Sequence, residues 1–193
     1  MQYWLHRIAH LEHVSYPLLD KGYLSIGFSE FCTGEFFEMV AQNKDWDYLE
    51  NDFNERWGCL PRNRHNLWRF LAEMNKGDWV VVPSWGTFST YELCDNLPIM
   101  ATDDDIAPPK EDWNGKAIIR DTKTGFLKLE GDEECLDIGF LRKVKLICKD
   151  ISRTDYADAA LTSRMKIQNT NANISDLEEN IKKALSAYKN NRP

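Results

Sequence analysis

The feature that most constrains the fold is a helical segment that leads almost directly into a buried strand. Asn66 to Asn75 places its apolar residues on one side of a helix. Lys76-Gly77-Asp78 breaks that helix, and Trp79 to Pro83 is then expected as a buried strand. Thr87 to Leu93 is its expected partner across a turn at Trp85-Gly86. Helix and strand therefore alternate within one stretch, which indicates an α+β fold.

The helical and the alternating spacing of apolar residues also predict the remaining elements. Further strands are expected at Tyr3–Ala9, Tyr23–Phe28, Ala117–Arg120, Phe126–Leu129 and Ile138–Ile147, and further helices at Ser15–Lys21, within Glu35–Trp57 and at Tyr156–Leu161. The last helix is expected to open with a capping box, Ser175-Asp-Leu-Glu178, and to carry an amphipathic stripe.

The chain of 193 residues fits one domain with a helical appendage. We assign residues 1–168 to a recognition domain, with an acidic excursion at 95–137, and 169–193 to a linker and a C-terminal helix. Seven tryptophans argue against a disordered composition.

The cellular compartment is predicted from the N-terminus and the cysteines. The first ten residues hold no uninterrupted apolar stretch, so neither a signal peptide nor a membrane span is expected. The five cysteines are scattered, without a C-x-x-C pair, which is typical of reduced thiols. We therefore predict a cytoplasmic protein.

The net charge of −7 seemingly opposes a nucleic-acid partner, but the charges are unevenly distributed. Acidic residues gather at 95–112 and 130–137, whereas 62–69 holds three arginines and no acid. Residues 140–153 hold five basic residues against one aspartate. Because the local potential guides an anionic ligand to a groove, a nucleic-acid interface stays open. The alternative is that these runs are solvated faces of ordinary elements.

No grouping of residues predicts a catalyst, a metal site or a cofactor. His6, His10, His13 and Cys32 lack ligand spacing, since His6 and His10 share a strand face that His13 does not. Asp121-Thr-Lys123 has the D-x-K form of a nuclease metal site but falls in a predicted hairpin turn. A metal-dependent nuclease is therefore a remote alternative.

The aromatic residues give a more coherent signal. Trp85 lies in a tight strand connection beside a glycine, which suits the rim of a pocket where a base can stack. Trp4 lies on the first strand beside a histidine and an arginine, and for both residues a pocket and a core position are equally open. Trp46, Trp57 and Trp79 are expected in the core.

At Asn66-Leu-Trp-Arg-Phe-Leu-Ala-Glu-Met74 and Lys76-Gly-Asp-Trp-Val-Val-Val-Pro83 the chain resembles the N-terminal domain of Mrr-like restriction endonucleases. Trp4–Arg7, Gly22–Phe28 and Val144–Arg153 support the resemblance in the same order. It implies a mixed β-barrel of the PUA, EVE and YTH group, flanked by helices. It also implies binding of an extruded or modified base, in DNA rather than RNA, within a restriction or defence system.

On this basis we predict a base pocket and a phosphate-binding set. The pocket residues are Trp4, Phe28, Ser84 and Trp85, and the phosphate-binding residues are Arg7, Arg69, Arg142, Lys143 and Arg164. No endonuclease domain is recognised in the chain, so cleavage would need a nuclease partner. The rival hypothesis is an interaction module of a defence complex, which dimerises through Ile181 and Leu185 of the last helix.

Overall fold

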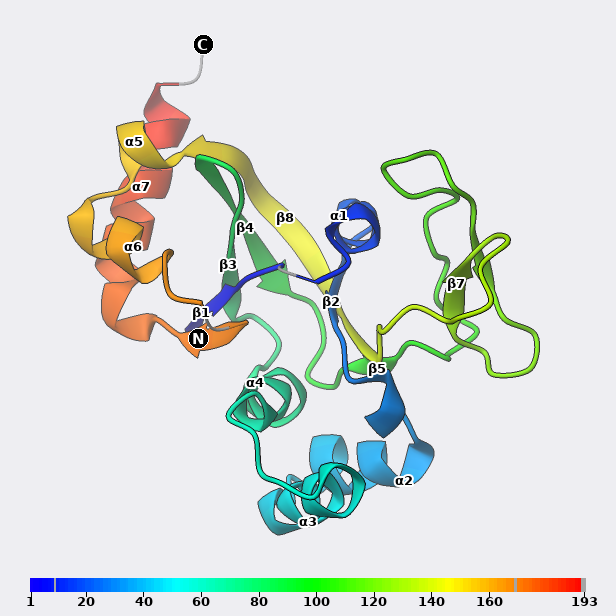
Figure 1. The fold of residues 1–193 in the computed structure, drawn as a ribbon. Helices are drawn as coiled ribbons and strands as arrows, with labels where there is room; N and C mark the ends of the chain where they lie inside the picture. Colours follow the sequence, from blue (N-terminus) through cyan, green and yellow to red (C-terminus); the bar gives the residue numbers. More distant parts are fainter. Residues whose placement is uncertain (9, 169, 192–193) are drawn as a thin grey trace.

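A curled sheet that forms half a barrel lies at the centre of the computed structural model, which describes residues 1–8, 10–168 and 170–191 (Figure 1). The strand order is β2-β8-β4-β3-β1-β9, and β5 also pairs with β8. Among the strand pairs of the described residues, β1–β3 is the one parallel pair in this sheet. The strands are β1 (Tyr3–His6), β2 (Tyr23–Ile26), β3 (Trp79–Pro83), β4 (Thr87–Leu93), β5 (Ile99–Met100), β8 (Phe140–Ser152) and β9 (Asn171–Asn173).

The long strand β8 joins the edge strand β2 to the central strand β4. Its first residues, 140–143, pair with β2, and 144–152 pair with β4. The register against β4 shifts around Thr90, where an irregularity lets the strand bend. One continuous strand therefore curls the sheet.

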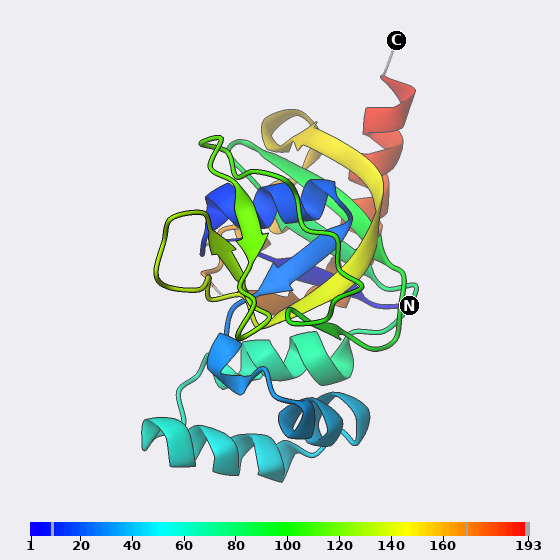
Figure 2. The same cartoon turned by 90° about the vertical axis from the view of Figure 1, so that its right-hand side faces the viewer.

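Helices cover both faces of this sheet (Figures 1 and 2). They are α1 (Glu12–Asp20), α2 (Gly34–Phe36), α3 (Trp46–Trp57), α4 (Arg64–Trp68), α5 (Arg153–Tyr156), α6 (Ala159–Arg164) and α7 (Glu178–Asn190), with the short segments η1 (Ser29–Phe31), η2 (Phe37–Gln42), η3 (Arg69–Glu73) and η4 (Ser175–Leu177). The α+β class is thus confirmed.

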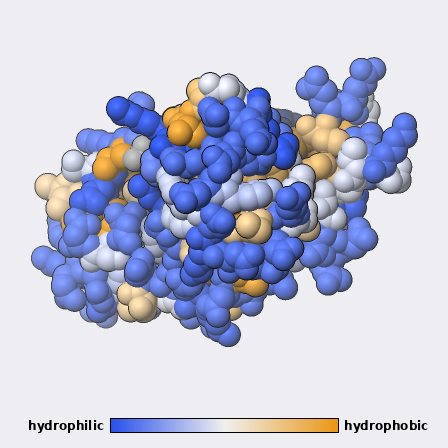
Figure 3. Space-filling model, turned by 90° about the horizontal axis from the view of Figure 1, so that it is seen from below, coloured by the Kyte–Doolittle hydropathy of each residue, from blue (hydrophilic) through white to orange (hydrophobic). Residues whose placement is uncertain are grey.

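Alternation along the strands divides the apolar residues between two cores. Trp4, Val80 and Val82 face α2 to α4, while Leu5 and Val81 face α6 and α7. The outer surface of the α2–α4 layer is mostly hydrophilic, with small scattered apolar patches (Figure 3). Among the described residues, no helix has both the length and the apolar composition that crossing a bilayer requires.

The helix–strand unit is present as predicted, and Asp78 explains its short break. The carboxylate of Asp78 accepts hydrogen bonds from the Gln2 amide at 2.7 Å, the Asn75 amide at 3.0 Å and the Trp4 indole at 3.0 Å. Asp78 is only 4% exposed, so these bonds replace the water that a buried carboxylate would lose. The break is therefore a buried polar junction between β1, η3 and β3.

The acidic excursion lies beside the sheet, contributes β5 to it and carries a core of its own. Its hairpin consists of β6 (Ile118–Arg120) and β7 (Leu127–Leu129), close to the predicted strands. Ile118 and Leu127 pack with Val14 and Leu18 of α1. The excursion is therefore anchored on α1.

The C-terminal segment is an integral part of the fold. β9 pairs with β1, and the apolar stripe of α7 is buried in the second core, with Ile181 at 0% and Leu185 at 4% exposure. The hypothesis that these two residues form a dimer interface is therefore wrong, because they already contact the sheet. Residues 9, 169, 192 and 193, which fall in two of the predicted segments, lie outside the described residues.

The predicted capping box is also wrong. The Ser175 hydroxyl accepts a hydrogen bond from the Tyr3 amide at 3.0 Å, and no side chain caps α7. The Glu178 carboxylate contacts the Tyr3 hydroxyl at 3.5 Å instead of reaching back along its own helix. Both residues thus attach α7 to β1.

The burial of α7 gives a stability prediction. Ile181→Ala should lower the free energy of unfolding by about 2–5 kcal/mol, because it leaves a cavity in the second core. The exposed neighbour change Lys183→Ala should have little effect. Urea unfolding measures both, and light scattering should show the same oligomeric state for both variants. A change of oligomeric state with unchanged stability would contradict this placement of the helix.

Candidate functional site

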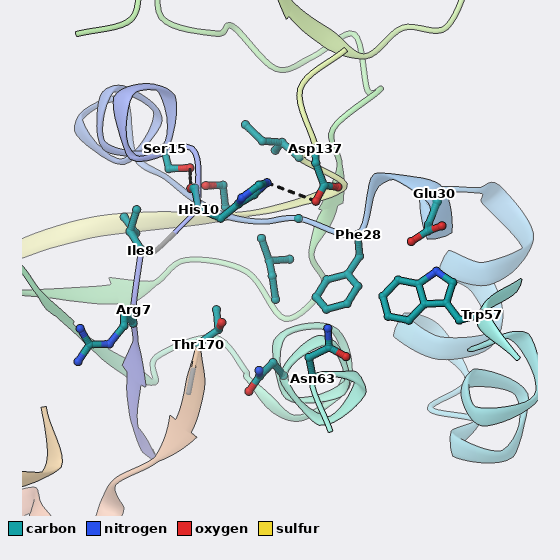
Figure 4. Close-up of a pocket in the computed structure, with 15 residues that line it drawn as sticks. Arg7, Ile8, His10, Ser15, Phe28, Glu30, Trp57, Asn63, Asp137 and Thr170 are labelled. Carbon is teal, nitrogen blue, oxygen red and sulfur yellow. Dashed lines mark hydrogen bonds and ion pairs between the residues drawn. The ribbon is translucent and has the colours of Figure 1, made fainter. Parts of the chain in front are cut away.

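A pocket of about 280 Å³ opens beside the ends of β1 and β2 (Figure 4). Its lining residues come from five parts of the chain: Arg7, Ile8, His10 and Ser15; Ser25, Ile26, Gly27, Phe28 and Glu30; Trp57, Asn63 and Asn66; Asp137 and Ile138; and Thr170. This volume lies just below the usual range for small-molecule sites, roughly 300–1,000 Å³, so it suits one planar ring system.

The aromatic wall of the pocket consists of Phe28 and Trp57. Their ring centroids are 6.2 Å apart and the planes are inclined by 22°. Phe53 and Phe31 support them from behind by edge contacts with Phe28 at 6.0 and 6.2 Å. A flat ligand can stack on such a wall, because the rings are held by their own packing.

Phe28 has a left-handed backbone conformation, with φ of 64°. This conformation is costly for a bulky residue and persists only where its surroundings enforce it. Gly139 supplies the constraint, since its amide donates to Ile26 O at 3.0 Å and Gly27 O at 3.2 Å. A Cβ on Gly139 would lie 2.6 Å from the Phe28 carbonyl oxygen. The loop that presents Phe28 therefore depends on the backbone contact with Gly139.

Asp137 forms the polar edge above this loop. One carboxylate oxygen accepts hydrogen bonds from the amide and the hydroxyl of Ser29, each at 2.8 Å. The other oxygen lies 3.4 Å from His10 Nε2, and the Asp137 side chain is half exposed. This second oxygen is therefore accessible to a ligand.

A buried polar network lies behind the opposite wall. Asn171 contacts His6 Nδ1 through its side-chain oxygen at 2.6 Å and donates its amide nitrogen to Asn66 O at 2.9 Å. The Asn171 backbone amide donates to Asn66 Oδ1 at 3.3 Å. The side-chain oxygen of Asn66, a lining residue, is thus occupied, and no hydrogen bond from its Nδ2 is found among the described residues.

His6 is held neutral by burial in this network. Desolvation lowers the pKa of His6 to about 4, although its hydrogen bonds to Asn171 and to Ser25 O favour the charged form. Burial outweighs them because the ring is only 1% exposed.

The Gly139 contact predicts that Gly139→Ala destabilises the protein. The new methyl group must displace the backbone around Phe28, which should cost about 1–3 kcal/mol of unfolding free energy. Gly34→Ala is the matched control, because Gly34 has open space around it and an ordinary φ. Thermal unfolding compares the two variants. Equal stability of the two variants would show that the Phe28 loop does not depend on the close approach of Gly139.

The pKa of His6 predicts a pH dependence of stability. Its folded value of about 4 lies below its usual 6.5, so the unfolded chain binds the extra proton first. The free energy of unfolding should therefore fall as the pH drops from 6.5 towards 4, by up to about 1.4 kcal/mol per pH unit. Urea unfolding of wild type and of His6→Gln measures this slope, with His10→Gln as an exposed control. A wild-type slope equal to that of His6→Gln would contradict the prediction.

The structure brings two of the predicted site residues, Phe28 and Arg7, to the same pocket. Trp4 is not among them. It is 1% exposed, and its indole bonds to Asp78, so no ring face is left for a base. The prediction for Trp4 is therefore wrong.

Ser84 and Trp85 lie at the β3–β4 turn, outside the pocket lining. Trp85 is 85% exposed, and the Ser84 carbonyl accepts a hydrogen bond from the Arg153 guanidinium. The turn meets α1 where the Tyr16 hydroxyl contacts Pro83 O at 3.4 Å. The predicted base-pocket residues are thus divided among three places: the core, the pocket and the β3–β4 turn.

The predicted phosphate-binding residues are dispersed. Arg142 is 1% exposed and donates to Phe70 O at 2.6 Å and Leu71 O at 3.1 Å, and burial lowers its pKa to about 10. Its assignment to phosphate is therefore wrong. Lys143 is exposed on β8, Arg164 pairs with Asp176 at 2.7 Å, and Arg69 donates to Asn171 O at 2.9 Å. Those three do not converge on the pocket lining.

The side chains whose sequence pattern resembles a metal site have other partners in the structure. Within the described part of the chain, no three His, Cys, Asp or Glu side chains are grouped to hold a metal ion. Asp121 Oδ1 accepts from the Lys123 and Thr124 amides and the Thr124 hydroxyl, while Oδ2 pairs with Lys128. These hydrogen bonds lower the pKa of Asp121, whose carboxylate organises the β6–β7 turn.

Sequence reasoning missed Trp57, Asn66 and Asp137 as pocket residues. Trp57 was assigned to the core, because its spacing in the helix matched the buried Leu49 and Phe53. Asp137 belongs to an acidic run that gave no sign of a site. Gly27 beside Phe28 was the available signal, since a glycine next to an aromatic residue after a strand marks a close backbone approach.

Comparison of the chain with models of known families, with curated proteins and with solved structures finds no match. The fold and the pocket define the class: an α+β domain with a half-barrel sheet and one aromatic-walled pocket. The function must be inferred from the pocket itself.

Proposed function

We propose that the protein is a nucleic-acid recognition module that binds one extruded base in the pocket beside Phe28. The observation that carries this proposal is the strained Phe28 loop, which holds an aromatic wall next to polar groups. Strain of this kind is found where surroundings enforce a functional geometry.

The chemistry of the pocket suits a nucleobase. Stacking on Phe28 and Trp57 offsets the cost of unstacking the base, since each stacked base contributes roughly 1–3 kcal/mol. Asn66 Nδ2 offers a donor and Asp137 an acceptor, which can read the edge of the ring. Two carboxylates, Asp137 and Glu30, line the pocket, so a phosphate group is disfavoured inside it.

The phosphates would lie at the mouth of the pocket. Arg7 lines the pocket, and exposed Arg62 adjoins the lining residue Asn63. No ion pair is recorded for Arg62 among the described residues. Arg7 and Arg62 are therefore the proposed contacts to the phosphate backbone of the nucleic acid, in place of the basic residues that the structure disperses.

The biological setting rests on the sequence resemblance. The resemblance to N-terminal domains of Mrr-like restriction endonucleases points to a PUA- or EVE-like domain, to DNA, and to a restriction or defence system. In that setting a separate nuclease would cut the DNA that this domain recognises.

Binding of oligonucleotides with one unpaired base tests the proposal. Fluorescence anisotropy should show that Phe28→Ala weakens binding by about tenfold or more, because it removes the stacking face. Trp85→Ala is the matched aromatic control, and it should change the affinity less, since Trp85 lies outside the lining.

Salt dependence gives the second readout. Binding should weaken as salt rises, because phosphate contacts release counterions. The proposed site would be refuted if the protein bound neither single-stranded nor mismatched DNA at low salt. It would also be refuted if Phe28→Ala and Trp85→Ala lost the same amount of affinity.

A further inference from the structure

The acidic groups of the pocket lie on the same side as its aromatic wall (Figure 4). Asp137 lies above Phe28, and Glu30 lies above Trp57. Both carboxylates therefore border the surface on which a ring would stack.

The cations nearby compensate this acidic end only in part. Arg7 lies across the pocket from Glu30, and its guanidinium donates to the carbonyl oxygens of Ile167 and Met165 (Figure 4). Arg56, whose charge interacts with Glu30, pairs with Asp52 at 2.8 Å. His10 faces Asp137 at 3.4 Å and carries charge only when it is protonated. The aromatic end of the pocket is thus electronegative.

We infer that the pocket prefers a base that carries a positive charge on its ring, as adenine alkylated at N1 and cytosine alkylated at N3 do, over a neutral base. This inference rests on the proposed function and specifies its ligand. A cationic ring stacks on aromatic faces with a cation–π contribution, and the adjacent carboxylates add Coulomb attraction.

The cost of extrusion favours the same ligand class. A methyl group on the pairing nitrogen of adenine or cytosine blocks the Watson–Crick edge, so the base is already unpaired. Extrusion costs least for a damaged or mismatched base. Such a pocket would therefore select these alkylated bases both by their positive charge and by their loss of Watson–Crick pairing.

Two nucleosides with one methyl group on the same base test the inference. 1-Methyladenosine carries the methyl group on a ring nitrogen and is cationic at neutral pH, whereas N6-methyladenosine carries it on the exocyclic nitrogen and is neutral. The carboxylate variants Asp137→Asn and Glu30→Gln separate the effect of charge from that of methyl position. Titration calorimetry with the full chain should show about tenfold tighter binding of 1-methyladenosine. The same pair placed in a single-stranded oligonucleotide should give the same order.

Two variants identify the groups responsible. Asp137→Asn keeps an oxygen for the Ser29 hydrogen bonds but removes the charge, and Glu30→Gln removes the second charge. Each should reduce the preference for the cation several-fold, while binding of N6-methyladenosine changes little. Asp132→Asn, in the excursion and paired with Lys116, is the matched control and should keep the preference.

The outcomes separate the two proposals. If neither nucleoside nor any oligonucleotide binds, the proposed function fails and this inference fails with it. If N6-methyladenosine binds as tightly as 1-methyladenosine, or if both variants keep the full preference, only the inferred charge selection fails. A cation preference that falls in both pocket variants and persists in Asp132→Asn supports it.

Discussion

The buried junction around Asp78 is the interaction on which the arrangement of sheet and helices depends. Its carboxylate joins the start of β1 to the end of η3, through the Trp4 indole and the Asn75 amide. Arg142 of β8 donates to the last carbonyl groups of the same helical layer. Both groups are almost fully buried and Asp78 interacts electrostatically with Arg142, so removing either charge would leave the other less compensated. Three distant parts of the chain are thereby fixed around one polar centre.

That junction also shows how much of the fold the sequence can predict. Asn66–Pro83 was predicted correctly because its period changes from helical to strand-like at a glycine, a signal that local residues determine. Arg142 was misassigned because an arginine suggests a surface role, and Trp4 because its pattern left a pocket and a core position equally open. Their burial depends on Asp78 and on carbonyl groups far away in sequence, which no local pattern reveals.

The candidate site was predictable only in part for the same reason. Phe28 could be found from its position after a strand and beside Gly27. Its left-handed conformation depends on Gly139, which is over a hundred residues away, so spacing within the loop could not predict it. Asp137 reaches the pocket only because the excursion returns to the sheet there.

The origin of the pocket walls has a consequence for synthesis of the protein. Thr170 and Asn66 face a cavity that Arg7 and Phe28 also line, so nearly the whole chain contributes to one small volume. Contacts so remote in sequence form late, after the entropy of closing long loops has been lost. A nascent chain that has not yet released β9 from the ribosome would therefore have its aromatic wall but not a closed cavity. Ligand binding would begin only after Thr170 and β9 have left the ribosome.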